Sequence, residues 1–298
     1  MAPRRIPGPD RAGRIMRLVR HGQPGSERPG LIAPDGGVRD CSAQVADYDH
    51  AFFSGGGLER LRDLTADVER LPAVAPGTRL GAPVARPRNV LAIGLNYRDH
   101  ARETGAEIPA EPVLFMKATG TVCGPNDPIL IPRGGLKTDW EVELAVVIGR
   151  PARYLESPAA ARGFVAGFCA ANDVSERAFQ RERGGQWSKG KSSDNFLPLG
   201  PWLATVDEVP DPQALALTLD VNGVRKQSGH TSEMIFDVWF LVHYLSQFLT
   251  LEAGDVLITG TPAGVGMGRT PAEYLRPGDV VELAIDSLGR QRCVCQQA

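Results

Sequence analysis

The sequence lacks the features that would direct it to a nucleic acid, a membrane or an oxidising compartment. Its 298 residues carry 33 lysines and arginines against 35 acids, and this balance offers no basic surface to nucleic acid or an anionic membrane. Its five cysteines have neither zinc-binding nor disulfide spacing, which predicts reduced thiols in the cytoplasm. The longest apolar segment, residues 234–251, is interrupted by polar residues and predicts a buried helix rather than a membrane span.

A signal peptide and internal repeats are also missing. Residues 1–15 have no apolar core and predict a disordered basic extension, so Met16 could be the functional start. Residues 16–80 combine strand-like pieces with one amphipathic helix and predict a small α/β N-terminal domain. Residues 81–298 predict a mainly β domain with helices near 157–163, 175–183 and 235–249. Strands there outnumber helices and do not alternate with them.

What the sequence does have is a concentration of acids in "TDWEVELAVVIG", residues 138–149. Asp139, Glu141 and Glu143 are two residues apart, so on a strand all three project from one face. Taken alone, this alternation favours a face in contact with water. However, no lysine or arginine is interleaved, and the apolar run that follows indicates a strand buried on both faces. A bound cation is the alternative.

A further carboxylate, Asp173, ends a second apolar strand, and Ser175 is predicted to cap the helix after it. If Glu141, Glu143 and Asp173 converge, their repulsion requires that one of them be protonated or that a cation neutralise them. Oxygen ligands without histidine or cysteine predict Mg²⁺ first, then Mn²⁺ or Ca²⁺.

Groups that could hold an anionic substrate follow Asp173. Arg177 and Gln180 are three residues apart and share a helix face. The segment "GGQWSKGKSSD" predicts a glycine-rich loop that presents Lys191. In "VLITGTPAGVGMG" no helix is predicted after the glycines, which argues against a dinucleotide-binding loop. We interpret it as a close approach of backbone to a small ligand, with Thr261 as a hydroxyl donor.

The segment "GLNYRDHARETG" brings a histidine beside a glutamate. Asp99 is predicted to cap a short helix that ends at Gly105, which places His100 and Glu103 on one side. A carboxylate that orients an imidazole makes it a better base. An isolated surface histidine is more often inert, but the glycines and the proline-rich residues that follow fit a mobile lid.

These segments together resemble a known family. "GLNYRDHARE", "TDWEVELAVVIG", "NDVSERAFQ", "GKSSD" and "GDVLITGTPAGVG" have the order seen in the fumarylacetoacetate hydrolase superfamily, over residues 89–289. The N-terminal "MRLVRHG" and "PGLIAPDG" resemble the branch that contains 2,4-diketo-3-deoxy-L-fuconate and L-rhamnonate hydrolases, whose members are often labelled ureidoglycolate lyases. The resemblance implies a mixed, mainly β fold, a β-sandwich roll behind a small N-terminal domain, in a homodimer.

The resemblance also assigns roles to single residues. It implies that Glu141, Glu143 and Asp173 bind the metal ion, with Asp139 as an outer neighbour. His100 and Glu103 correspond to the pair that activates water. The groups that hold the carboxylate and oxo oxygens of a substrate correspond to Arg177, Gln180, Lys191 and Thr261.

The implied reaction is hydrolysis of a carbon–carbon bond in a 2,4-dioxo acid to pyruvate and a second acid. Water activated by His100 would attack the 4-oxo carbon, and the metal ion and Lys191 would stabilise the enolate that leaves. The same chemistry would serve an oxaloacetate decarboxylase or a 2-hydroxy-dienoate isomerase. A metal-dependent module that only binds small acids is a further alternative, against which the His100–Glu103 pair argues. A lid with few aromatic residues favours a short polar tail, as in a diketo-deoxy sugar acid.

Overall fold

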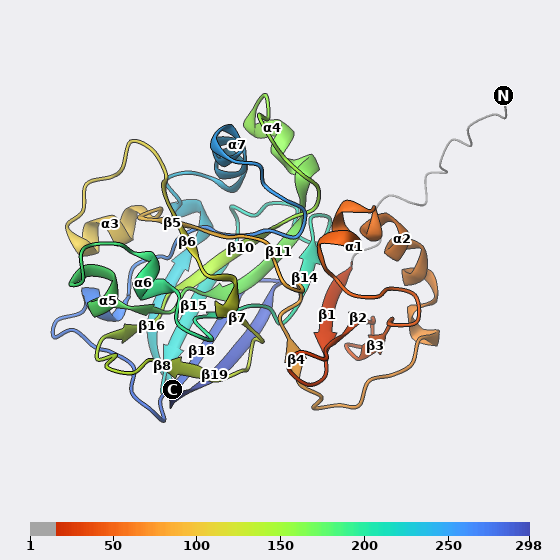
Figure 1. Ribbon diagram of the computed structural model, residues 1–298, viewed down its shortest axis with the longest axis horizontal. Helices are drawn as coiled ribbons and strands as arrows, with labels where there is room; N and C mark the ends of the chain where they lie inside the picture. The colour runs from red at the N-terminus through yellow and green to blue at the C-terminus, as the bar shows by residue number, and fades with distance from the viewer. Residues whose placement is uncertain (1–15) are drawn as a thin grey trace.

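The computed structural model describes residues 16–298, and β-structure dominates it, with 32% strand and 22% helix (Figure 1). The largest sheet has ten strands and runs through the centre of the molecule. Its order is β3 (Val38–Asp40), β2 (Arg28–Ile32), β1 (Arg17–His21), β14 (Leu203–Thr205), β11 (Val165–Asn172), β10 (Val142–Ile148), β17 (Val256–Ile258), β5 (Val90–Gly94) and β6 (Val113–Lys117), with β4 (Leu80–Gly81) beside β1.

A second sheet of five strands packs near the large one. It consists of β16 (Val224–His230), β15 (Ala216–Val221), β18 (Val280–Ile285), β19 (Gly289–Gln297) and β8 (Ile129–Ile131). Two short pairs complete the strands: β9 (Thr138–Asp139) with β12 (Ser175–Glu176), and β7 (Val122–Cys123) with β13 (Leu197–Pro198). The expected mainly β architecture is confirmed.

Seven short α-helices lie around these sheets within residues 16–298. They are α1 (His50–Ser54), α2 (Gly57–Leu64), α3 (Arg98–Thr104), α4 (Pro158–Ala161), α5 (Arg177–Arg181), α6 (Ser188–Lys191) and α7 (Val238–Phe248). The longest, α7, starts where the Asp237 side chain accepts a hydrogen bond from the backbone N–H of Phe240 at 2.8 Å, and packs beside α4. None of the described helices has both the length and the apolarity to cross a membrane.

The core explains the apolar run after Glu143. Strand β10 is buried along its whole length, and its two faces enter different hydrophobic clusters. Leu144 and Val146 pack into one cluster with α7, whereas Ala145 and Val147 pack into the other, which includes residues of the N-terminal region. Such a strand reads as continuously apolar because neither face meets water.

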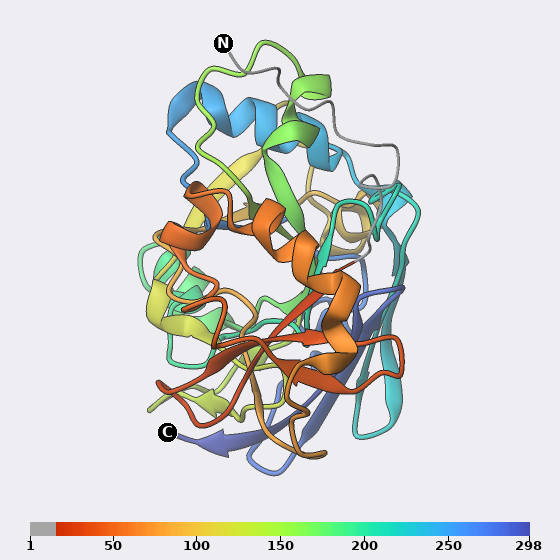
Figure 2. The same ribbon diagram turned by 90° about the vertical axis from the view of Figure 1, so that its right-hand side faces the viewer.

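Residues 16–80 share the large sheet with the rest of the chain. Leu18 of β1 pairs with Leu203 of β14. Helices α1 and α2 lie on the side of the molecule that β1, β2 and β3 occupy (Figures 1 and 2). The amphipathic spacing predicted a helix, and the chain forms α2 followed by a 3₁₀ helix over Thr65–Arg70. The predicted boundary at residue 80 stays a prediction, and the expected extension at residues 1–15 lies outside the described residues.

Three local predictions are wrong. Ser175 does not cap α5, because Glu176 does so by accepting from the backbone N–H of Ala178. Asp99 lies inside the first turn of α3, which begins at Arg98. The segment around Lys191 is not an open loop but the short helix α6. By contrast, Gly105 ends α3 with φ of 64°, a left-handed conformation that glycine adopts without strain.

Candidate active site

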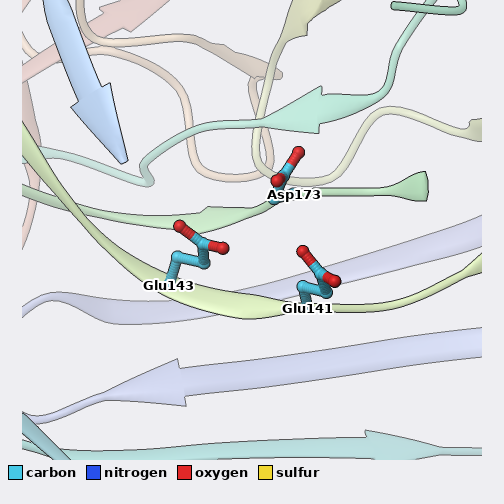
Figure 3. A group of neighbouring side chains, drawn as sticks. All are labelled: Glu141, Glu143 and Asp173. Carbon is cyan, nitrogen blue, oxygen red and sulfur yellow. The ribbon is translucent and has the colours of Figure 1, made fainter. Parts of the chain in front are cut away.

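Three buried carboxylates meet where β10 and β11 lie side by side. Strand β10 is antiparallel to β11, and the backbone N–H of Asp173 donates to the carbonyl of Glu141 at 2.9 Å. One oxygen from each of Glu141, Glu143 and Asp173 lies within 4.8 Å of the other two, and Figure 3 shows the three side chains gathered on one side of these strands. The interpretation of the acidic face as exposed to water is therefore wrong.

Buried cations make this burial possible. The Lys191 ammonium donates to Glu141 Oε2 at 2.6 Å and to Asp173 Oδ2 at 2.5 Å. Lys117 donates to Asp173 Oδ1 at 2.5 Å and is fully buried at the end of β6. No lysine or arginine lies between the acids along the chain, and the fold brings these cations from distant segments.

Arg177 is the third cation. Its Nε donates to Asp139 Oδ2 at 2.8 Å, and its terminal nitrogens donate to Glu141 Oε1 at 2.6 Å and to Gln180 Oε1 at 3.1 Å. Asp139 in turn accepts from the backbone N–H groups of Gly266 at 2.7 Å and Met267 at 3.0 Å. Asp139 therefore ties Arg177 to the glycine-rich loop after β17 and lies outside the carboxylate cluster.

The electrostatic surroundings distinguish the carboxylates. Burial would raise the pKa of Glu141, but Arg177 and Lys191 outweigh it and lower the pKa well below its ordinary value. Burial raises the pKa of Glu143 well above its ordinary value, and the nearby Asp173 and Glu141 raise it further. Among residues 16–298 no basic side chain bonds to Glu143, which accepts from the backbone N–H of Gly260 at 2.7 Å.

The two lysines on Asp173 are not equivalent. Burial would lower the pKa of Lys191, but Asp173 and Glu141 outweigh it, so the pKa is raised. Burial lowers the pKa of Lys117 and the nearby Lys191 lowers it further, and together they outweigh Asp173, which raises it.

The residues present fit a hard divalent cation. Four carboxylates, counting Asp139, are buried beside three buried cations. With all four ionised, one negative charge on the Glu143 side has no compensating cation, so burial and the neighbouring carboxylates raise the pKa of Glu143, and a bound cation would favour its ionised form. Each carboxylate oxygen has two lone pairs, so an oxygen bonded to a lysine can still bind an ion. Uncompensated charge among oxygen ligands is the environment that Mg²⁺ and Mn²⁺ prefer.

The predicted histidine–glutamate pair is formed. His100 Nδ1 lies 3.2 Å from Glu103 Oε2 on α3, and the other oxygen of Glu103 accepts from the backbone N–H of Gly264 at 2.9 Å. His100 lines the same pocket as the three carboxylates. The sequence thus placed the pair on the right helix, and the fold brings that helix to the carboxylates.

The remaining predicted residues reach the pocket in different ways. Gln180, Lys191 and Thr261 all line it. The Thr261 hydroxyl, however, donates to the carbonyl of Val142 at 2.9 Å and accepts from Gln227 Nε2 at 2.8 Å. Its proton is used within the protein, so its part in substrate binding stays a prediction, as do the catalytic roles of the other residues.

Several pocket residues escaped the sequence analysis. Phe115 on β6, Trp187 beside α6 and Arg181 at the end of α5 line the outer part of the pocket, and Lys117 lies behind Asp173. The segment after α3 has few aromatic residues, as the sequence showed, but Phe115 and Trp187 bring aromatic surface to the pocket from other elements. In the structure, the alternating burial of β6 places Phe115 and Lys117 on one face of the strand, which the residues of this segment do not indicate by themselves.

Comparison with known proteins agrees with this geometry. The family model described as "Fumarylacetoacetate (FAA) hydrolase C-terminal" matches residues 89–296. A Burkholderia multivorans protein, named provisionally as a hydrolase, is 54% identical over 277 residues, which are 93% of this chain and 97% of the relative. The solved fumarylacetoacetate hydrolase of Exiguobacterium antarcticum is 37% identical with a TM-score of 0.84, over 95% of this chain and 100% of that one.

Two other solved structures extend the range of named activities. A 5-carboxymethyl-2-hydroxymuconate delta-isomerase from Mycobacterium smegmatis is 31% identical with a TM-score of 0.73, over 95% of this chain and 99% of that one. Maleylpyruvate hydrolase from Sphingobium sp. SYK-6, solved in complex with manganese(II) ion and pyruvate, is 25% identical with a TM-score of 0.79. That match covers 95% of this chain and 100% of the other.

Proposed function

Because the chain belongs to the fumarylacetoacetate hydrolase family, we propose that it hydrolyses a carbon–carbon bond of a 2,4-dioxo acid in the presence of a divalent metal ion. The products are pyruvate and a second acid. The substrate is an acylpyruvate or a diketo-deoxy sugar acid. The observation that carries the proposal is one pocket that contains both a cluster of three carboxylates and a histidine oriented by a glutamate.

Glu141, Glu143 and Asp173 are the proposed ligands of the metal ion, with Mg²⁺ first and Mn²⁺ as the alternative. When bound, the ion would act as a Lewis acid toward the carboxylate and 2-oxo oxygens of the substrate. Arg177 holds Glu141 and Lys117 holds Asp173, so the ligands are fixed before any substrate arrives. Lys191, which spans Glu141 and Asp173, adds positive charge beside the substrate oxygens.

His100 is the proposed base. Glu103 occupies Nδ1, so the proton from water is taken up at Nε2. The hydroxide attacks the 4-oxo carbon, the bond between C3 and C4 breaks, and the electron pair left on C3 takes up a proton to give pyruvate. The glycine-rich loop steadies this arrangement, since Gly264 donates to Glu103 and a side chain at Gly268 would collide with Glu103.

An isomerase acting on a 2-hydroxy-dienoate is the second candidate, favoured by the 31% identity to a delta-isomerase. It needs the same ion and the same proton transfer, but no attack by water. Oxaloacetate decarboxylation and simple binding of a small acid remain the other outcomes of an assay. The resemblance in the N-terminal region further supports the diketo-deoxy sugar acid branch. We also propose that the protein is a homodimer in the cytoplasm. Sedimentation at several protein concentrations would test the dimer.

A substrate panel with Mg²⁺ or Mn²⁺ tests the proposal. Acylpyruvates, diketo-deoxy sugar acids, oxaloacetate, ureidoglycolate and 2-hydroxy-dienoates are each incubated with the enzyme, and pyruvate, CO₂ and ultraviolet absorbance are followed. Pyruvate released without CO₂ from a 2,4-dioxo acid is the expected result. Turnover of oxaloacetate or a dienoate alone would refute hydrolysis and leave the second candidate or the decarboxylase.

A further inference from the structure

We infer that Gln227, on β16, is a positioning residue that fixes the backbone between Glu141 and Glu143 to the glycine-rich loop, residues 260–268. The inference rests on the proposed function, because Gln227 would act on the metal ligands and, through the loop, on the proposed base. Gln227 itself is fully buried, and its contact with the pocket is through Thr261.

Gln227 is the single buried residue of a strand that otherwise meets solvent. Strand β16 lies at the edge of the five-stranded sheet, and its other residues are exposed or half-buried. The inward-facing position of this strand is therefore occupied by an amide rather than by an apolar side chain. A buried amide destabilises the fold unless its hydrogen-bonding groups have partners, so the partners of Gln227 indicate what it does.

These partners determine the orientation of the amide. Its Oε1 accepts from the backbone N–H of Val142 at 2.9 Å, and its Nε2 donates to the carbonyl of Pro262 at 2.9 Å. An N–H group can only donate and a carbonyl can only accept, so a reversed amide would lose both bonds. Nε2 also donates to Thr261 Oγ1 at 2.8 Å, and the Thr261 hydroxyl donates to the carbonyl of Val142 at 2.9 Å. The two side chains thus close a ring of hydrogen bonds on one backbone unit.

That backbone unit carries the carboxylate cluster. Val142 lies between Glu141 and Glu143, whose side chains point to the same side of the ribbon (Figure 3). Strand β17 pairs with residues 145–147 of β10, so this pairing ends before Val142. Gln227 bonds Val142 where the paired strand has ended, and it thereby holds the backbone from which both glutamates project. The spacing of two ligands depends on such support from residues behind them.

The glycine-rich loop packs on the backbone of β16 on both sides of Gln227. A Cβ atom on Gly264 would lie 2.1 Å from the carbonyl oxygen of Lys226. A Cβ atom on Gly229 would lie 2.4 Å from the side chain of Pro262. Both contacts require bare backbone, so the loop has one position on the strand, and the bond from Gln227 to Pro262 lies between them.

The same loop carries the support of the proposed base. The backbone N–H of Gly264 donates to Glu103 Oε1 at 2.9 Å, and Glu103 Oε2 contacts His100. The carbonyl of Gly264 accepts from Trp140 Nε1 at 3.1 Å, one residue before Glu141 along the chain. A shift of the loop would therefore move the histidine–glutamate pair relative to the carboxylates.

The test is Gln227→Met, which keeps the length of the side chain and removes its three hydrogen bonds. The affinity for Mn²⁺, measured by calorimetry, should fall about 10-fold, the lower end of the loss seen when a residue that supports a metal ligand is removed. The electron paramagnetic resonance spectrum of the bound Mn²⁺ should also change, because it depends on where the ligands lie. For a substrate that the wild type turns over, kcat should fall about 10- to 100-fold with a smaller change in KM, as expected for misplaced groups.

The matched control is Gln291→Met, at a second buried glutamine of the same sheet. Its Nε2 donates to the carbonyls of Ala170 at 2.9 Å and Gly200 at 3.0 Å, and within residues 16–298 its amide bonds neither residues 141–143 nor the loop. This variant should lose stability toward urea but keep the affinity and the spectrum of the wild type. A further variant, Gly229→Ala, keeps every hydrogen-bonding side chain and displaces Pro262, so it should weaken Mn²⁺ binding by a smaller factor.

The metal measurements separate this inference from the proposed function, since neither the affinity nor the spectrum requires turnover. Weaker binding and an altered spectrum in Gln227→Met, with both unchanged in Gln291→Met, support the positioning role even if no dioxo acid is hydrolysed. Wild-type affinity and spectrum in Gln227→Met, or an equal loss in Gln291→Met, would overturn the inference and leave the proposed function intact. Absence of Mn²⁺ binding to the wild type would overturn both.

Discussion

The inner and outer halves of the pocket are built in opposite ways. In the inner half, Glu141, Asp173 and Lys191 are fully buried and bonded to one another. In the outer half, Trp187 is half-buried and Arg181 is exposed, with no protein carboxylate beside it. Charges removed from water need partners at fixed positions, so the inner half is held rigidly, and it is the half in which we propose that the reaction takes place. The outer half has no such network of buried ion pairs, and we propose that it contacts the substrate tail.

The largest expected effect concerns the proton transfer in the inner half. His100→Gln should lower kcat about 10²- to 10⁴-fold, because the variant cannot take the proton from water. Its affinity for Mn²⁺ should stay that of the wild type, since His100 is not among the clustered carboxylates. The matched control is His230→Gln, at an exposed histidine. Wild-type turnover by His100→Gln at saturating substrate would show that this pair is not the base.

The next effect tests whether the inner half depends on its buried ion pairs. Lys117→Met should lower the free energy of unfolding by about 3–5 kcal/mol in the presence of a chelator, the cost of breaking a buried pair. Saturating Mn²⁺ should recover part of this loss, because an ion bound only to the folded state stabilises it. Urea unfolding measures both quantities, with the exposed Lys189→Met as control. An unchanged unfolding midpoint in chelator would mean that Lys117 does not hold Asp173.

Substitution of Gly94 tests the outer half of the pocket and leaves every charged side chain unchanged. Gly94→Ala should push Trp187 off the backbone and lower kcat/KM for planar tails about 2- to 10-fold relative to a methyl tail, the value of one aromatic contact. The control is Gly120→Ala, where an added Cβ meets no atom within 4 Å. If the ratio between tails does not change, Trp187 plays no part in selectivity.

The smallest effect lies outside the pocket, at His21 on β1. Burial lowers the pKa of His21 more than the nearby Asp40 raises it, and Arg28 also lowers it. A depressed pKa means that the unfolded chain binds the proton more tightly, so this contribution to stability is present above about pH 6.5 and lost as the pH falls. Urea unfolding at pH 7.5 and 5.5 should show a smaller pH difference for His21→Gln than for the wild type. An equal difference in both proteins would exclude His21 as the source.

Local patterns in the sequence predicted the inner half better than the outer half. The alternation of Asp139, Glu141 and Glu143 predicted one acidic face, and Glu141 and Glu143 do enter the cluster, whereas Asp139 lies on the separate strand β9. The spacing of His100 and Glu103 requires only a helix. Lys117 and Trp187 have no comparable local signal. Parallel pairing of β17 with β5 and the antiparallel β6 bring Lys117 to Asp173, 56 residues away. The cap of α5 was missed because Ser175 and Glu176 are both able to cap, and only the turn geometry selects Glu176.

The most direct test of the account is a calorimetric titration of Mn²⁺ into the wild type, Glu143→Gln and Asp173→Asn, with the exposed Glu111→Gln as control. The central claim is that the inner half of the pocket is a metal centre. It predicts about one ion per chain in the wild type and the control. In the two cluster variants the affinity should be at least about 100-fold weaker, because loss of a residue that only hydrogen-bonds to a metal ligand already weakens binding up to about 100-fold. Equal affinity in all four proteins, or no binding to the wild type, would contradict it.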